Sequence, residues 1–114
     1  DEACVQFAKT FPKIIREIRA VNPDVKIYAD NIYNPAKGID AFSQVYSVAD
    51  AYINRMNRGF YPSDEYVLVD IKKCFDGEKE SMVNLSFKGR EIDPHPSEKG
   101  HKKIAQMVIK AMER

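Results

Sequence analysis

The sequence predicts a mixed α/β fold in which amphipathic helices cover a sheet of parallel strands. Three observations support this prediction. The apolar residues include eleven Ile and nine Val but only two Leu, a balance that favours buried strands. Residues 66–71 form an almost wholly apolar run, which is typical of a parallel strand covered on both faces. Stretches with helical spacing alternate with stretches of strand length, as in βα folds.

The length and the charge of the chain limit the classes of function that we expect. The 114 residues fit one small domain, and eighteen basic against seventeen acidic residues leave a formal charge of +1. This balance creates no field that attracts nucleic acid or an anionic membrane, so we expect no nucleic-acid partner. No apolar run approaches the roughly 20 residues that span a bilayer, and the first residues lack a signal-peptide layout. The sequence does not indicate a cellular location.

The first predicted element is a helix over residues 5–21. Pro12 lacks an amide hydrogen, so we expect either a kink there or a fresh helix start capped by Thr10. The helix ends at Asn22, because the residue before a proline is pushed out of the helical region. Apolar residues at intervals of three or four positions predict one buried stripe, made of Phe7, Phe11, Ile14, Ile18 and Val21.

A strand and a helix are predicted next. Residues 25–33 are rich in β-branched and aromatic side chains and run up to the turn Asn34-Pro35, which predicts a strand. Asp40 can cap the helix that follows, and Gly59 stands where a left-handed residue would end it. The apolar stripe expected in the core consists of Phe42, Val45, Tyr46, Ala49, Tyr52, Ile53 and Met56.

The second strand, 66–71, leads into a charged stretch, 74–92, which we interpret as a surface connection with one short element near residues 82–85. Ser97 can cap the last helix. The last helix has its apolar side at Ile104, Met107, Val108, Ala111 and Met112.

Two parallel strands with three amphipathic helices leave apolar faces uncovered, so we expect part of a larger layered domain.

The most informative segment is 93–105, DPHPSEKGHKKIA. Pro94 and Pro96 stiffen the backbone on both sides of His95, just before a helix begins. The partial positive charge at a helix N-terminus disfavours imidazolium, which keeps His95 available as a neutral base. Asp93 is close enough in sequence to accept a hydrogen bond from the other ring nitrogen. The pattern predicts a general base with a carboxylate that orients it.

This segment resembles the last motif of the SGNH, or GDSL, hydrolases, a family of serine esterases and lipases. The sequence FPKIIREIRAVNPDVKIYADNIYNP is similar to that family's helix and fourth strand, and YVLVDIKKCF to its fifth strand and following helix. The resemblance covers all of 1–114 and implies the C-terminal part of a flavodoxin-like three-layer α/β/α sandwich. It implies ester hydrolysis by a Ser-His-Asp mechanism with His95 and Asp93 as catalytic residues.

The family takes its serine from a Gly-Asp-Ser motif and its oxyanion donors from that serine, a glycine and an asparagine in Gly-x-Asn-Asp. Neither motif occurs in this sequence. The resemblance therefore implies that the N-terminal half of the enzyme, or a swapped second copy, supplies them, and that this chain alone is inactive. The family's usual spacing is Asp-x-x-His, but here Ile92 occupies that place. Either Asp93 or a backbone carbonyl would then orient His95.

Asn31, Tyr33 and Asn34 are candidate substrate contacts. They follow the first strand, at the carboxyl end where open α/β sheets bind their ligands. In that position they would shape the pocket for the acyl or alcohol part of an ester. The alternative is that Asn34-Pro35 only makes the turn and that Tyr33 packs in the core.

The sequence contains no residue spacing that is typical of a metal site or a redox motif. Cys4 and Cys74 lie far apart with no CxxC or Cys/His spacing, and we expect free thiols, with one disulfide as the alternative. Asp93, His95 and His101 do not match a zinc pattern, and His101 is expected to be solvated. The sequence therefore predicts no metal and no cofactor.

The sequence also allows a function without catalysis. A half-domain with an open sheet edge can bind a protein partner by adding a strand to the sheet. Such a protein has no use for a histidine at the end of its sheet. Replacing His95 therefore separates the two functions, because only an esterase loses its activity.

Overall fold

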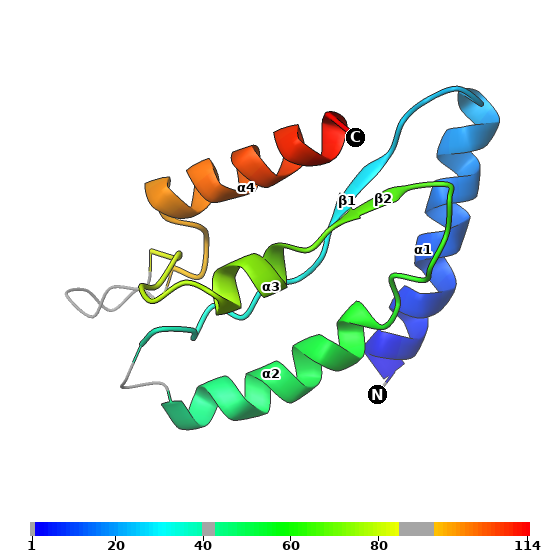
Figure 1. The fold of residues 1–114 in the computed structure, drawn as a ribbon. Coiled ribbons are helices and arrows are strands. Elements are labelled where there is room, and N and C mark those ends of the chain that lie inside the picture. The colour runs from blue at the N-terminus through cyan, green and yellow to red at the C-terminus, as the bar shows by residue number, and fades with distance from the viewer. Residues whose placement is uncertain (1, 40–42, 85–92) are drawn as a thin grey trace.

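The fold is that of a computed structural model, which describes residues 2–39, 43–84 and 93–114. The expectations for Asp40, Phe42, Leu85 and Ile92 lie outside these residues. The chain is a mixed α/β structure with the predicted alternation of helices and strands (Figure 1). The elements are α1 (Glu2–Val21), β1 (Tyr28–Asp30), α2 (Ser43–Asn57), β2 (Val67–Val69), α3 (Ile71–Asp76) and α4 (Glu98–Met112).

The two strands are parallel and shorter than predicted. Tyr28 pairs with Val67 and Asp30 with Val69. One further hydrogen bond extends the ladder at each end, from Val67 N to Ile27 O (2.8 Å) and from Asn31 N to Val69 O (3.2 Å). Beyond Asn31 the chain leaves the sheet to build the turn that leads towards α2. The predicted strand over 25–33 is therefore reduced to its centre.

Helices cover both faces of this small sheet, each over its own apolar cluster (Figure 1). On one face, Tyr28 and Val69 pack with Phe75 and with the apolar side of α4. On the other face, Ala29 and Tyr66 pack with Phe11 and Ile15 of α1. Neighbouring residues of a strand point to opposite faces, which is why Tyr28 and Ala29 join different clusters. Four residues of the predicted α4 stripe pack as expected, whereas Met112 is 57% exposed.

Helix α1 differs from the prediction in its buried face. It runs through Pro12, which excludes the fresh start capped by Thr10, one of the two predicted alternatives. The stripe continues from Phe11 to the buried Ile15, while Ile14 is 49% and Val21 is 87% exposed. Periodicity alone did not show the direction from which α1 meets the sheet. The aromatic rings of Phe7 and Phe60 also pack at this contact, with their centroids 5.1 Å apart.

The predicted left-handed helix end at Gly59 is wrong. Among the described residues only Gly38 has a positive φ, +80°. A glycine is needed at position 59 for another reason, because a Cβ there would lie 2.4 Å from Cδ1 of Phe7. The helix before it, α2, also departs from its predicted stripe. Ile53 is buried, but Val45 is 54% and Tyr52 is 42% exposed, so Tyr52 is not a core residue.

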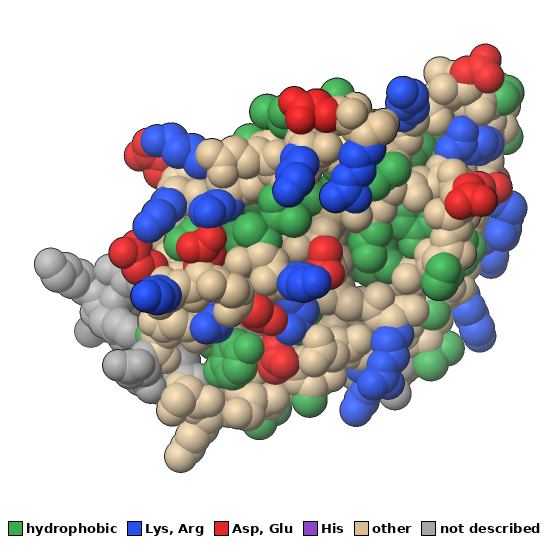
Figure 2. Space-filling model, in the orientation of Figure 1, with side chains coloured by type: hydrophobic (Ala, Val, Ile, Leu, Met, Phe, Trp, Pro, Cys, Tyr) green, Lys and Arg blue, Asp and Glu red, His purple; other side chains and the backbone are tan. Residues whose placement is uncertain are grey.

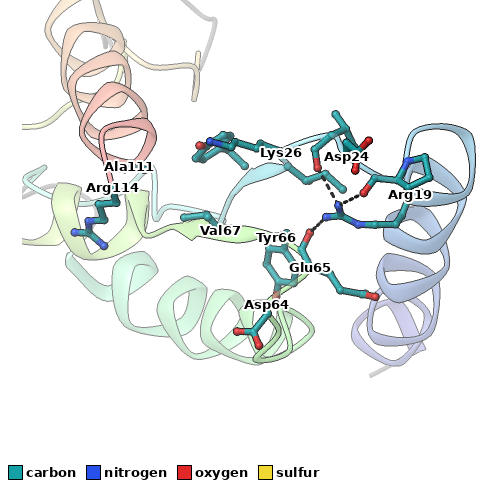
Figure 3. A pocket seen from close by; sticks show the side chains of 13 residues that line it. Arg19, Asp24, Lys26, Asp64, Glu65, Tyr66, Val67, Ala111 and Arg114 are labelled. Atoms are coloured by element: carbon teal, nitrogen blue, oxygen red, sulfur yellow. Dashed lines mark hydrogen bonds between the residues drawn. The ribbon is translucent and has the colours of Figure 1, made fainter.

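Arg19, near the C-terminus of α1, forms hydrogen bonds to the backbone just before each of the two strands. Its guanidinium donates to the carbonyl oxygens of Pro23 (3.0 Å) and Val25 (2.9 Å), which precede β1. It also donates to the carbonyl oxygen of Glu65, just before β2 (Figure 3). One planar side chain thus holds the starts of both strands beside the helix.

The molecule exposes more surface than a compact protein of its size. Its accessible surface is 8091 Å² and its radius of gyration is 15.7 Å. A compact monomer of this mass exposes about 6,400 Å², and a compact domain of this length has a radius of about 13 Å. Val67 and Leu68 of β2 are 39% and 41% exposed, so the cover predicted on both faces of the apolar run 66–71 is only partial. Figure 2 shows uncovered hydrophobic side chains around the middle of one face.

Within the described residues no helix is long and apolar enough to span a membrane. Both cysteines are free thiols, Cys4 being buried and Cys74 half-buried. Burial raises the pKa of the Cys74 thiol. Cys74 is therefore a weak nucleophile, because the thiolate is the reactive form of cysteine.

Candidate functional site

The loop that carries His95 is fixed by the first turn of α4. Ser97 caps this helix, as predicted, and its Oγ accepts a hydrogen bond from Gly100 N at 3.1 Å. Ser97 N in turn donates to Met82 O (2.8 Å). A Cβ at Gly100 would stand 2.1 Å from that same carbonyl oxygen, so only glycine allows the approach. Gly100, the glycine of the predicted motif, therefore allows α4 to pack closely against the preceding loop.

A short antiparallel contact continues this anchoring towards the histidine. Val83 and Pro96 form an isolated β-bridge, which is the short element expected near residues 82–85. Asn84 N donates to His95 O at 2.9 Å. The backbone of His95 is thus held on one side by Asn84 and on the other by the helix cap at Ser97.

Asp93 and His95 form a close pair. The ring Nδ1 of His95 lies 2.6 Å from Oδ1 of Asp93, and the backbone N of His95 donates to the same oxygen at 3.0 Å. The backbone hydrogen bond, followed by the ring hydrogen bond, lowers the pKa of Asp93. An ionised carboxylate only accepts, so in neutral His95 the proton is on Nδ1 and the lone pair is on Nε2. The pair has the composition of a general base with its orienting acid.

Asn84 contacts the other side of the same carboxylate. Its Nδ2 lies 3.4 Å from Oδ2 of Asp93 and 3.2 Å from the carbonyl oxygen of Pro96. The sequence shows Asn84 only as part of an Asn-Leu-Ser glycosylation triplet. Its contact with Asp93 depends on the folding of the loop and has no signal in the sequence.

His95 lines an open hollow of about 490 Å³ at the carboxyl end of β1, together with Asn31, Ile32, Tyr33, Pro35, Ile53 and Pro94. The side chain of His95 is 80% exposed, so the ring is accessible from solvent. Parallel sheets bind ligands at this end of their strands. The structure therefore brings two of the three predicted substrate contacts, Asn31 and Tyr33, into one hollow with His95.

Tyr33 connects the two sides of the hollow. Its hydroxyl donates to the carbonyl oxygen of Pro94 at 2.8 Å, and its ring packs on Phe75 with centroids 5.0 Å apart. Burial, followed by the charge of Asp93, raises the pKa of Tyr33, which keeps the phenol protonated as a donor. Tyr33 thus both packs, as the alternative prediction stated, and holds the residue before His95.

Asn31 is held at the rim by the start of α3. Its Nδ2 donates to Oδ1 of Asp70 at 2.7 Å, and its Oδ1 accepts from Lys72 N at 2.9 Å. Asp70 caps α3 by accepting a hydrogen bond from Lys73 N at 3.0 Å. The amide of Asn31 retains one hydrogen and one lone pair that can meet a ligand.

Asn34 does not contact the hollow, and its predicted substrate contact is corrected here. It is 1% exposed, and its Nδ2 donates to Tyr46 O (3.1 Å) and approaches Oδ1 of Asp50 (3.3 Å). Its Oδ1 accepts from Ala36 N at 3.0 Å. A buried amide with these partners stabilises the turn after β1, which was the alternative prediction.

The remaining histidine lies away from this site. His101 is exposed on α4. In residues 2–39, 43–84 and 93–114, no three His, Cys, Asp or Glu side chains gather in a way that could hold a metal ion. The polar side chains at the hollow are the imidazole of His95, the phenol of Tyr33 and the amide of Asn31, and the carboxylate of Asp93 contacts the imidazole.

Comparison with protein-family models, curated proteins and solved structures gave no match.

Proposed function

We propose that this chain is the C-terminal part of an SGNH-type serine hydrolase domain and that it supplies the histidine and aspartate for ester hydrolysis. The observation that carries the proposal is the Asp93–His95 pair at the carboxyl end of a parallel sheet, with 2.6 Å between Oδ1 and Nδ1. This contact leaves Nε2 as the basic nitrogen, beside a hollow that also contains Asn31 and Tyr33. The resemblance of residues 93–105 to the family's last motif supports the same function.

In the proposed reaction a serine from another segment attacks the ester carbonyl carbon. Nε2 of His95 takes the serine proton as the new C–O bond forms, and Asp93 stabilises the imidazolium. The bond to the alcohol then breaks, and the alcohol leaves with the proton from Nε2. Water repeats the sequence on the acyl-enzyme and releases the acid. General-base catalysis of this kind is worth about 10²–10⁴-fold in rate.

The proposed complete domain is a flavodoxin-like three-layer sandwich, of which α1, the sheet and α4 would be one part. The accessible surface of 8091 Å² supports this, because it exceeds that of a compact monomer by about 1,700 Å². Permanently associated chains bury about 1,000–2,500 Å² on each partner. The exposed Val67 and Leu68 lie where further structure would cover the sheet. The N-terminal half of the same enzyme, or a swapped second copy, is the proposed partner.

The test uses the complete domain, in which a segment carrying Gly-Asp-Ser is joined to this chain or mixed with it. Hydrolysis of p-nitrophenyl acetate is compared for the unchanged protein, His95→Ala and His101→Ala. We expect His95→Ala to lose about 10²–10⁴-fold in kcat and His101→Ala, the matched exposed histidine, to keep its activity. Association, measured by sedimentation, should be equal in all three. Equal activity of His95→Ala and His101→Ala would refute the proposal.

A second candidate function is the binding of a protein strand at the edge of the sheet. It is favoured by one observation, that within the described residues each strand has a partner on one side only. Unpaired backbone groups at such an edge can pair with a strand from another protein. In that case a partner would bind equally well to His95→Ala, and no ester would be cleaved by the complete domain.

A further inference from the structure

The carboxylate of Asp93 is contacted from two directions. Its Oδ1 lies 2.6 Å from ring Nδ1 of His95 and accepts from the backbone N of the same residue at 3.0 Å. Only Pro94 separates the two residues, so these contacts set the carboxylate relative to His95 but do not hold the pair against the rest of the molecule. Oδ2 accepts from Nδ2 of Asn84 at 3.4 Å. Asn84 therefore connects the pair to another segment of the chain.

Asn84 contacts three of the four residues in the segment 93–96. Besides the carboxylate of Asp93, its Nδ2 donates to the carbonyl oxygen of Pro96 at 3.2 Å. Its backbone N donates to the carbonyl oxygen of His95 at 2.9 Å. Both partners of the side chain are acceptors, which fixes the amide with its amino group towards them. One residue thus holds the segment on both sides of the imidazole.

The pair depends on this additional contact because it is open to water. The side chain of Asp93 is 47% exposed and that of His95 is 80% exposed. Exposed pairs of this kind gain little free energy, since water competes for the charge and both side chains lose rotational freedom. The backbone and ring hydrogen bonds of His95, and after them the one from Asn84, lower the pKa of Asp93. Asn84 thus also favours the ionised carboxylate that accepts from the ring.

We propose that Asn84 is a positioning residue of the site, which holds the Asp93 carboxylate towards Nδ1 of His95 so that Nε2 stays the basic nitrogen. The inference rests on the proposed ester hydrolysis and adds a residue that acts through Asp93 without touching the substrate. The hydrogen bond at one ring nitrogen decides which nitrogen carries the proton. A neutral ring protonated on Nε2 cannot take the proton of a serine at that atom. Asn84 therefore raises the fraction of His95 in the reactive tautomer.

The first test measures this tautomer and needs no substrate. The chain is labelled with ¹⁵N and measured alone and after mixing with the unlabelled segment that carries Gly-Asp-Ser, so the two histidines observed are His95 and His101. The ring ¹⁵N shifts of neutral His95 give the ratio of the two tautomers. We expect Asn84→Ala to shift this ratio by about fivefold towards the form protonated on Nε2. The exposed His101 should keep its ratio in every variant.

The second test measures kcat and KM of the complete domain with p-nitrophenyl acetate. Asn84→Ala should lower kcat by about fivefold with little change in KM, because a misplaced base weakens the transition state and not the binding of substrate. Asn84→Asp keeps the shape of the side chain but places a second carboxylate opposite Asp93. It should lower kcat further, because like charges repel.

Asn54→Ala is the matched control for Asn84→Ala. Nδ2 of Asn54 also donates to a carboxylate, that of Asp50, at 3.2 Å on the exposed surface of α2. Asn54 does not line the hollow that contains His95. We expect Asn54→Ala to keep both the kcat of the complete domain and the tautomer ratio of His95.

The two tests distinguish this inference from the proposed function. If Asn84→Ala changes the tautomer ratio but the unchanged domain cleaves no ester, Asn84 positions the pair and the proposed ester hydrolysis fails. If the unchanged domain cleaves the ester while both Asn84 variants match Asn54→Ala in kcat and tautomer ratio, the inference is overturned and the proposed function stands. A rise in KM at unchanged kcat would also overturn it, because Asn84 would then contact the substrate. If Asn84→Ala does not fold, Asn84→Asp decides both comparisons.

Discussion

The hydroxyl of Tyr33 donates to the carbonyl oxygen of Pro94 at 2.8 Å, across the hollow at the end of β1. These two residues are sixty-one positions apart in the chain. Their hydrogen bond joins the turn after the first strand to the residue that directly precedes His95. Tyr33 is therefore a positioning residue for His95, and this role can be separated from a direct contact with the substrate.

Tyr33→Phe should keep the ring packed on Phe75 and remove only the hydrogen bond. We expect a loss of about 1 kcal/mol in stability and, in the complete domain, a fall of about fivefold in kcat with little change in KM. Tyr28→Phe is the control, because Tyr28 packs in the same cluster. A rise in KM with unchanged kcat would show that Tyr33 binds substrate and does not position His95.

Gly100→Ala should destabilise the packing of α4 against the loop that contains Met82. The new Cβ would lie 2.1 Å from Met82 O, a backbone atom that cannot move without breaking its hydrogen bond to Ser97 N. We expect a loss of about 2–4 kcal/mol in the free energy of unfolding, measured by urea denaturation.

Gly77→Ala is the matched control for that substitution. A Cβ at Gly77 would meet its nearest atoms at 3.5 Å, and the φ of −79° suits any residue. We expect no loss and a gain of up to about 1 kcal/mol, because alanine restricts the unfolded chain more than glycine does. Similar losses for both variants would contradict the steric explanation.

Asp50→Asn tests an ion pair between α2 and α3. Lys72 Nζ lies 2.9 Å from Asp50 and 2.6 Å from Asp76, and the Lys72 side chain is 12% exposed. Burial alone would raise the pKa of Asp50, but hydrogen bonds from Lys72 and Asn34, with the charge of Lys72, lower it below its usual value. We expect Asp50→Asn to cost about 1–2 kcal/mol at neutral pH.

The cost of Asp50→Asn should depend on pH in one direction. A carboxyl whose pKa is lowered by folding stabilises the fold above its unfolded pKa, about 4, and loses that contribution as the pH falls through the folded pKa. The two proteins should therefore converge in stability as the pH is lowered below about 4. The exposed Asp64→Asn should differ from the unchanged protein by less than about 0.5 kcal/mol at any pH. A constant difference for Asp50→Asn down to low pH would exclude the ion pair as its cause.

Arg19→Lys tests the contact between α1 and the starts of the strands. An ammonium group has all three of its donors on one nitrogen, whereas Arg19 reaches three carbonyl oxygens from two nitrogens in one plane. We expect a loss of about 1–2 kcal/mol, measured by urea denaturation. Arg16→Lys on the exposed side of the same helix should have little effect. Equal stabilities of the two variants would show that the Arg19 hydrogen bonds contribute nothing.

Local patterns in the sequence predicted the order of the elements and the cap at Ser97. Ser97 and Asp70 cap helices as their side chains and positions indicate, since capping depends on residues within one turn. The closeness of Asp93 to His95 was also predictable, because only Pro94 separates them. The order of helices and strands followed from periodicity for the same reason, since each period is a local property.

Features set by distant contacts could not be predicted. Gly59 was assigned to a left-handed turn, but the ring of Phe7 occupies the place of its side chain. Asn34 was a candidate ligand, yet α2 buries it against Tyr46. Asn84 contacts Asp93 because the residues after α3 pair with those before α4. Each depends on a partner at least nine positions away, which neither the helical nor the strand period specifies.

The two apolar clusters have no residue in common, and a ladder of three paired positions joins them. Cooperativity across the molecule therefore passes through this ladder and through the ion pair of Lys72 with Asp50. Native-state hydrogen exchange should reveal two protection groups, one over α1 and one over α3 and α4, that open with different free energies. One side should therefore open locally while the other stays folded, at a lower free energy than complete unfolding requires.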